Sequence, residues 1–129
     1  MPATVTSISG SPKKPMSNDR GLNHILVDGD GLNNIMIQVQ EFKVGAAFGK
    51  YHLHEHTDNV FFVIDGTLKA VVDGETHLLQ PGDLIFIPAG SPHKATNGGD
   101  TVVRALEIYA PPAGDDSHPA PDPTEGATA

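Results

Sequence analysis

The sequence predicts an all-β domain built as a barrel or a sandwich. Short apolar runs alternate with turn residues through most of the chain, which is typical of such folds. Two tight hairpin signals, Asp65-Gly66 and Asp73-Gly74, fall between such runs. No segment carries a convincing helical period, and a length of 129 residues suits one domain with one modest core.

The expected strands follow one another along the chain. Apolar and polar residues alternate from Ile37 onward, which favours a half-buried strand there. The turn Pro81-Gly82-Asp83 leads into another strand, and Pro88 ends it because proline cannot donate to a strand ladder. By such signals, strands are expected over residues 35–40, 68–72, 76–79, 84–87 and 101–109.

Both ends of the chain differ in composition from the β region. Residues 1–20 are rich in Ser, Thr and Pro, and they predict a flexible arm that could pair with a neighbouring subunit. Residues 111–129 are polar and rich in Pro, Ala and Asp, so they are predicted to be disordered. The barrel domain is therefore expected over residues 21–110.

Three histidines are the most informative residues of the chain. His52 and His54 are two residues apart, so in a strand they point to the same face, ~6.6 Å apart along its axis. Imidazole nitrogens bind transition metals at about 2.0–2.1 Å, so this pair can converge on one ion. A third histidine on a strand alongside, His93, would complete a metal site on a β scaffold.

These histidines lie within two motifs that resemble those of the cupin superfamily. The first motif fits at His52, His54 and Gly66, but Gly45 lies one residue further from His52 than the pattern asks. Asn59 holds the place that the pattern gives to a glutamate. The second motif fits at every spacing, with Gly82, Pro88, Gly90, His93 and Asn97.

The resemblance covers roughly residues 33–110 and implies a cupin-type double-stranded β-helix, which is a jelly-roll barrel. It implies one divalent transition metal per chain, held by His52, His54 and His93 with Asn59 in the fourth position. Fe(II) is favoured, and Zn, Mn, Ni, Co and Cu are compatible with the same ligands. The resemblance also implies a homodimer, because cupins commonly pair through exchanged edge strands.

The fourth position has competing candidates. Asn59 offers only a neutral carbonyl oxygen where a glutamate would bring a negative charge. Asp58 fits a shorter spacing of the motif and carries a charge; an unbroken strand would place it on the histidine face. His56 shares the parity of His52 and His54, so it is a candidate fourth ligand or a base in the pocket.

Parity along the strands suggests which side chains line a pocket. If Asn59 faces inward, Phe61 and Val63 face inward too and give the metal an apolar wall. Gln38 and Gln40 share a face and could hydrogen-bond a substrate, although the solvated outer face is the favoured place for them.

The last strand offers one further candidate for the pocket. Arg104 could bind a substrate carboxylate, with a surface position as the alternative. Arg104 and Glu107 lie on opposite faces of this strand, so at most one of them enters the barrel.

Composition narrows the classes of function. A net charge of −8 argues against binding nucleic acid, which needs a basic surface. The chain has no cysteine, so neither disulfides nor thiolate ligands are expected. No apolar run approaches the ~20 residues of a membrane span, and no secretory signal is evident, so a cytoplasmic location is the default expectation.

Three classes of function fit these observations. The first is a mononuclear metal enzyme acting on a small organic molecule, most plausibly a non-haem Fe(II) dioxygenase with a three-histidine site. Within the superfamily, three histidines without a carboxylate resemble the thiol and diketone dioxygenases. The second is a redox-neutral isomerase, cyclase or lyase in which the metal acts as a Lewis acid. The third is a non-catalytic binder of small molecules.

Overall fold

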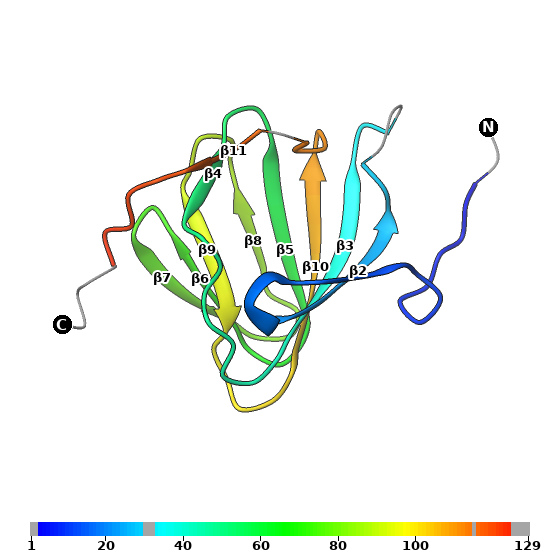
Figure 1. The fold of residues 1–129 in the computed structure, drawn as a ribbon, viewed down its shortest axis with the longest axis horizontal. Coiled ribbons are helices and arrows are strands. Elements are labelled where there is room, and N and C mark those ends of the chain that lie inside the picture. The colour runs from blue at the N-terminus through cyan, green and yellow to red at the C-terminus, as the bar shows by residue number, and fades with distance from the viewer. Residues whose placement is uncertain (1–2, 30–32, 115, 125–129) are drawn as a thin grey trace.

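Two antiparallel sheets form the core of the protein (Figure 1). The structure is a computed structural model, and it describes residues 3–29, 33–114 and 116–124. Within these residues one sheet has six strands in the order β1-β2-β3-β10-β5-β8, and the other has five in the order β11-β4-β9-β6-β7. The elements are β1 (Lys13–Pro15), η1 (Ser17–Asp19), β2 (Gly21–Val27), β3 (Met36–Phe42), β4 (His52–His54), β5 (Asp58–Asp65), β6 (Leu68–Val72), β7 (Glu75–Leu79), β8 (Leu84–Ile87), β9 (His93–Asn97), β10 (Val103–Ala110) and β11 (Ser117–Pro119).

The chain passes back and forth between the sheets. Strands β3, β5, β8 and β10 belong to the larger sheet, whereas β4, β6, β7 and β9 belong to the smaller one. This order is that of a double-stranded β-helix, so the predicted all-β jelly roll is confirmed. No helix within the described residues is long and apolar enough to cross a membrane.

The core lies between the sheets and consists of the side chains that alternate inward. Burial of apolar surface stabilises such a core by about 25 cal/mol per Å². Because the chain has no tryptophan, small aliphatic residues and two phenylalanines fill this space. The fully or almost fully buried residues include Val39, Phe42, Phe61, Val63, Leu68, Ala70, Val71, Leu79, Ile87, Val103 and Ala105.

Of the two hairpins predicted from Asp-Gly pairs, the one at Asp73-Gly74 is present, between the paired strands β6 and β7. At Asp65-Gly66 the chain passes instead from β5 of the larger sheet to β6 of the smaller one, so this turn does not close a hairpin. Asp73 and Gly74 both have a positive φ, 49° and 79°, as a two-residue turn of the I′ type requires. Gly66 has a φ of 77°, and a Cβ atom there would lie 2.6 Å from the carbonyl oxygen of Val102. A side chain at position 66 would therefore be strained and would also clash with backbone.

The ends of the chain are more ordered than their composition predicts. In the arm, β1 pairs with β2 of the same chain and Met16 is buried against the core. In the tail, where disorder was predicted from residue 111, β11 pairs with β4 and the Lys94 ammonium forms an ion pair with Asp122. The physical reason is that β4 would otherwise leave one edge of the smaller sheet unpaired, which local composition does not reveal. Residues 1–2 and 125–129 lie outside the described residues.

Candidate metal centre

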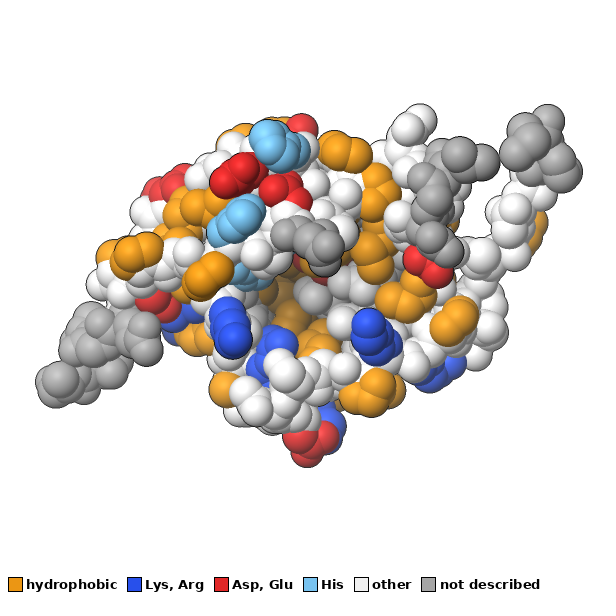
Figure 2. Space-filling view, turned by 45° about the horizontal axis from the view of Figure 1, so that its top comes forward, with side chains coloured by type: hydrophobic (Ala, Val, Ile, Leu, Met, Phe, Trp, Pro, Cys, Tyr) orange, Lys and Arg blue, Asp and Glu red, His pale blue; other side chains and the backbone are white. Residues whose placement is uncertain are grey.

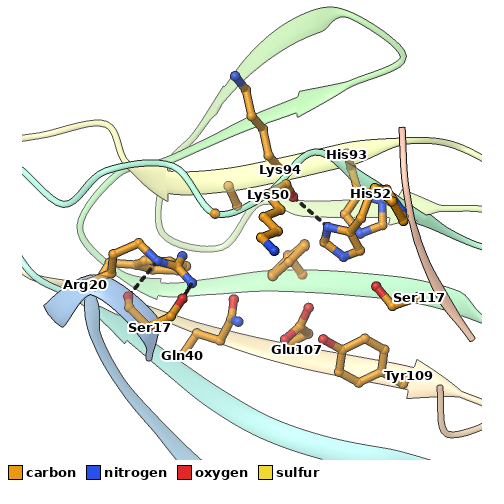
Figure 3. Close-up of a pocket in the computed structure, with 15 residues that line it drawn as sticks. Ser17, Arg20, Gln40, Lys50, His52, His93, Lys94, Glu107, Tyr109 and Ser117 are labelled. Carbon is orange, nitrogen blue, oxygen red and sulfur yellow. Dashed lines mark hydrogen bonds between the residues drawn. The ribbon is translucent and has the colours of Figure 1, made fainter. Parts of the chain in front are cut away.

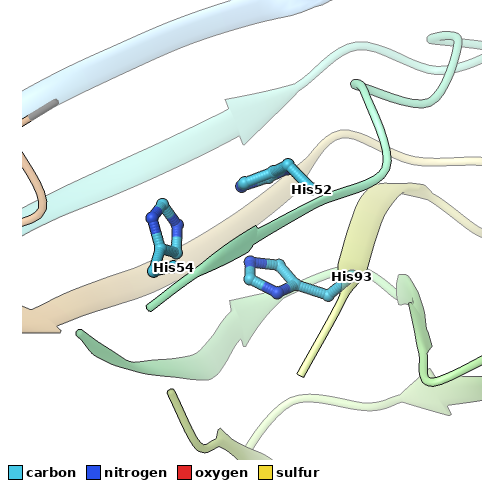
Figure 4. Close-up of side chains that lie close together, drawn as sticks. All are labelled: His52, His54 and His93. Atoms are coloured by element: carbon cyan, nitrogen blue, oxygen red, sulfur yellow. The ribbon is translucent and has the colours of Figure 1, made fainter. Parts of the chain in front are cut away.

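The three predicted histidines lie together inside the barrel (Figure 4). His52 and His54 are the two ends of the short strand β4, and His93 begins β9, directly opposite His52 in the ladder. One ring nitrogen of each lies within 4.8 Å of the others. The ring centroids are 4.5 Å apart for His52 and His93, 5.0 Å for His52 and His54, and 5.5 Å for His54 and His93.

Backbone carbonyls fix the tautomer of two of these rings. His52 Nδ1 lies 2.7 Å from the Lys50 carbonyl oxygen, and His93 Nδ1 lies 3.0 Å from that of Ser91. A carbonyl only accepts, so each Nδ1 carries the proton and donates it. Nε2 is then the nitrogen with a free lone pair, and ligand histidines in proteins are commonly oriented by a hydrogen bond of this kind.

Burial lowers the pKa of two of the three histidines, His54 and His93. Desolvation lowers the pKa of His93 to about 4, and the nearby His52 and His54 rings add to this effect. Desolvation and the charge of His52 also lower the pKa of His54. Since only a neutral imidazole binds a metal, these two ligands are ready for one at neutral pH.

The donor set fits a transition-metal ion. Among the described residues, both nitrogens of His54, Nε2 of His93 and Oδ1 of Asn59 are buried and have no hydrogen-bond partner. Buried polar atoms without partners are rare because each one costs free energy, and an ion bound by the three histidines would satisfy those of His54 and His93. Three imidazole nitrogens suit Fe, Zn, Ni or Cu better than Mg or Ca.

Asn59 and Asp58 occupy different environments. Asn59 is 1% exposed, and its Nδ2 donates to Glu107 Oε2 at 3.2 Å and to the Ile108 carbonyl at 3.0 Å. Because both hydrogen bonds engage the amide nitrogen, Oδ1 is the Asn59 atom that is free to act as a metal ligand. Asp58 instead accepts the backbone N–H of Ala89 at 2.9 Å, so its carboxylate is engaged with the loop that precedes His93.

His56 does not join the histidine group. Strand β4 ends at His54 and the chain bends at residues 55 and 56, so the parity that linked His56 to the other two is broken. Its side chain is 80% exposed and lies near Glu55, and its backbone N–H donates to Asp116 at 2.7 Å. The prediction that His56 is a fourth ligand or pocket base is therefore corrected.

A family model of the cupin domain matches residues 38–109, which is more than half of the chain. The chain belongs to the cupin family. The matched segment runs from β3 to β10 and includes all three histidines and Asn59.

Three known proteins illustrate what this cupin is similar to. Quercetin 2,3-dioxygenase of Bacillus subtilis is 48% identical over 42 residues, 33% of this chain but only 12% of the dioxygenase. The structure of the polyketide cyclase RemF from Streptomyces resistomycificus matches with a TM-score of 0.77 and 20% identity, covering 98% of this chain and 94% of the cyclase. A cupin-superfamily sugar phosphate isomerase from Silicibacter pomeroyi matches with a TM-score of 0.68 and 24% identity, covering 83% and 75%. The structural matches establish the shared fold.

Glu107 is a buried carboxylate of the cupin's interior, whereas the sequence left open whether Glu107 or Arg104 faces inward. It lies on β10 with 2% exposure, and Gln38 Nε2 donates to its Oε1 at 2.6 Å. Burial raises the pKa of Glu107 to about 7, although the hydrogen bonds from Gln38, Asn59 and Tyr109 act the other way. Burial and the neighbouring Glu107 raise the pKa of Tyr109 as well. Glu107 shares the parity of Val103 and Ala105, and this small apolar pair is buried on the inner face of β10. That shared parity was the sequence signal for an inward Glu107.

Arg104 lies on the opposite face of β10. Its Nε donates to Glu41 Oε1 at 3.0 Å, and the side chain is 43% exposed. The structure therefore does not bring Arg104 to the histidines, and Glu107 is the residue of this pair that enters the barrel.

A cavity of about 430 Å³ opens from the histidines toward the arm (Figure 3). Phe61 and Gln40 line it, together with His52, His93 and Glu107. A second cavity of about 600 Å³ opens on the other side of His52 and His54 and is lined by Gln38 and Tyr109.

Of the two predicted apolar wall residues, only one reaches this space. Phe61 lines the first cavity, whereas Val63 is fully buried in the core below it.

Proposed function

We propose that this cupin is a mononuclear metal enzyme acting on a small organic molecule, with its ion held by His52, His54 and His93. The observation that carries the proposal is the convergence of three imidazoles, of which His54 and His93 are buried and have ring nitrogens without hydrogen-bond partners. Asn59 Oδ1 is the proposed fourth donor. A cavity large enough for a small molecule adjoins the site.

Fe(II) dioxygenation is the first candidate reaction. A bound Fe(II) would supply the redox chemistry, with open coordination positions for the substrate and dioxygen. A set of uncharged ligands leaves the full charge of the ion to attract an electron-rich substrate oxygen. The 48% identity to quercetin 2,3-dioxygenase over 42 residues supports this candidate.

The protein's own groups have defined tasks in this proposal. Glu107 would take a proton from an acidic substrate group, since with a pKa of about 7 it is present in both protonation states near neutral pH. Gln38 and Asn59 hold its carboxyl group in place by donating to its two oxygens. Phe61 gives the cavity an apolar wall that limits the access of water.

A redox-neutral reaction is the second candidate, as an isomerase, cyclase or lyase. The observation that favours it is Glu107 itself, which lines the same cavity as His52 and His93. A carboxyl group there would transfer the proton in an enolisation while a bound metal ion would act as the Lewis acid. The overall similarity to a polyketide cyclase, with a TM-score of 0.77, is compatible with this candidate.

Metal content tests the proposal. Protein purified without an affinity tag should contain near one transition-metal ion per chain by elemental mass spectrometry. The His93→Ala variant should lose it, because one of three histidine ligands is gone. The matched control is His56→Ala, which removes an 80% exposed histidine two residues from the site and should keep the metal.

The identity of the metal separates the candidates. Iron favours the dioxygenase, and zinc, manganese or nickel favours the redox-neutral reaction. A wild-type chain that stays empty after anaerobic incubation with Fe(II), Mn(II), Zn(II) and Ni(II) would rule out both enzymes and leave a non-catalytic binder.

A further inference from the structure

The cavity beside the histidines is basic although the protein is acidic. The chain has a net charge of −8, but the cavity is lined by Arg20, Lys50 and Lys94, with Glu107 as its one acid among the described residues. Figure 2 shows basic side chains gathered along one side of a hollow in the surface, with histidine on the other side. A local concentration of positive charge in a concave site attracts anionic ligands.

Two of these three cations have no carboxylate partner within the part of the chain that the structure describes. Lys94 already forms an ion pair and a cation–π contact, since its Nζ lies 2.5 Å from Asp122 Oδ2 and 4.3 Å from the centre of the Phe48 ring. No carboxylate of the described residues forms an ion pair with Arg20 or Lys50. In Figure 3 Arg20 lies at one end of the cavity and His52 at the other, with the Lys50 amine between them.

Arg20 is positioned by its surroundings. Its Nε donates to the Ser17 carbonyl at 3.1 Å and its Nη2 to Ser17 Oγ at 3.4 Å. The guanidinium also packs on Gly49, where an added Cβ atom would lie 3.0 Å from Nη1. Partial burial lowers the pKa of Arg20, as it does for a cation removed from water without an anion beside it. A fork held in this way is suited to a planar anion.

We propose that Arg20 and Lys50 form a carboxylate subsite, and that the substrate of this cupin is a small organic acid whose carboxylate binds there while its reactive end faces the histidines. The inference rests on the proposed function, because it names the substrate class of the same site. Arg and carboxylate pair through two parallel N–H···O bonds, and one Lys adds a third donor. Arg pairs with phosphate in the same way, and the titration below separates the two anions.

The test is an NMR titration of metal-free, ¹⁵N-labelled protein with benzoate, benzamide and phenyl phosphate. The chain has two arginines, so the Nε–H signals of Arg20 and Arg104 report separately on the subsite and on an outer-face control. Benzoate should shift the Arg20 signal and the amides of Gly49 and Lys50 in a saturable way, with Arg104 unchanged. Benzamide, which has the same shape without the charge, should cause no such shift.

Variants then assign the binding to named groups. Arg20→Gln should weaken benzoate binding about tenfold or more, as expected for loss of a charge-assisted hydrogen bond. Lys50→Gln removes an exposed side chain, so it keeps the fold and should weaken binding less. Gly49→Ala should weaken it slightly by displacing the guanidinium. Arg104→Gln, the matched control, should bind like the wild type.

Three results would overturn the subsite: no saturable shift of Arg20 with benzoate, equal binding of benzamide, or unchanged affinity in both Arg20→Gln and Lys50→Gln. Phenyl phosphate binding at least tenfold tighter than benzoate would assign the cations to a phosphate and refute the carboxylate. Because the titration uses metal-free protein, a chain that binds benzoate but no metal sinks the proposed function and leaves this inference standing. A chain that binds metal but shows no saturable benzoate binding would refute the carboxylate subsite and leave the proposed function intact.

Discussion

At the scale of single residues, His93 and Glu107 make contributions to folding stability that change with pH in opposite directions. The pKa of His93 is lowered from 6.5 to about 4, so its contribution to stability is present above pH 6.5 and is lost as the pH falls toward 4. The pKa of Glu107 is raised from 4.5 to about 7, so its contribution is present below pH 4.5 and is lost as the pH rises through 7. Each shift corresponds to about 3 kcal/mol, and the two windows overlap almost completely.

Glu107→Gln should reveal this compensation in the metal-free protein. On lowering the pH from 7 to 4.5, the wild type should gain about 3 kcal/mol of unfolding free energy relative to the variant, because only the wild type carries the carboxyl group. Urea unfolding at several pH values measures the difference. Glu75→Gln, an exposed glutamate of β7, is the control and should run parallel to the wild type. Parallel curves for Glu107→Gln would show that Glu107 has no shifted pKa.

At the scale of elements, the sequence predicted those turns and strands that depend on residues close together in the chain. The Asp73-Gly74 turn and the strand carrying His52 and His54 follow from residues close in sequence, and both are present. The inward position of Glu107 and the outward position of Arg104 depend on which face of β10 meets the core, which spacing alone leaves open.

The pairing of β11 with β4 could not be predicted from the sequence. A segment of Pro, Asp and Ala carries no strand signal, and its partner strand lies some 60 residues earlier. What stabilises it is the unpaired edge of β4 and the contact of Ala120 N–H with the Tyr51 carbonyl at 3.1 Å. Because β4 carries two of the three histidines, the tail also supports the candidate centre from outside.

Removing the tail should therefore weaken both the fold and the metal site. A chain ending at residue 113 loses the β11–β4 hydrogen bonds, so its unfolding free energy should fall by about 1–3 kcal/mol. Metal affinity, measured by competition with a chelator, should fall with it because β4 becomes a free edge. The control is a chain ending at Thr124, which keeps β11 and should match the full chain in both measurements. Unchanged metal affinity in the chain that ends at residue 113 would show that the tail does not support the metal site.

At the scale of the whole molecule, the outer face of the larger sheet exposes apolar side chains near its β8 edge. Strand β8 is the last strand of the six-stranded sheet, and it pairs with β5. On the outer face of these strands four apolar side chains are exposed, by 38% to 58%: Phe62, Ile64, Leu84 and Phe86. Contiguous exposed apolar side chains on a sheet edge mark an association surface or a risk of aggregation.

We propose that this surface, formed by β5 and β8, joins two copies of the chain in the homodimer that the family resemblance implies. A twofold interface of this kind would bury each copy's apolar face against the other's. The wild type should then have the mass of a dimer by multi-angle light scattering, and Phe86→Lys should be a monomer because it places a charge in the interface. Leu78→Lys is the matched control, since Leu78 is 60% exposed on β7 of the other sheet and should leave the dimer intact. A wild type that is monomeric at the highest soluble concentration would leave the apolar face to another partner, and a dimer that survives Phe86→Lys would place the interface elsewhere.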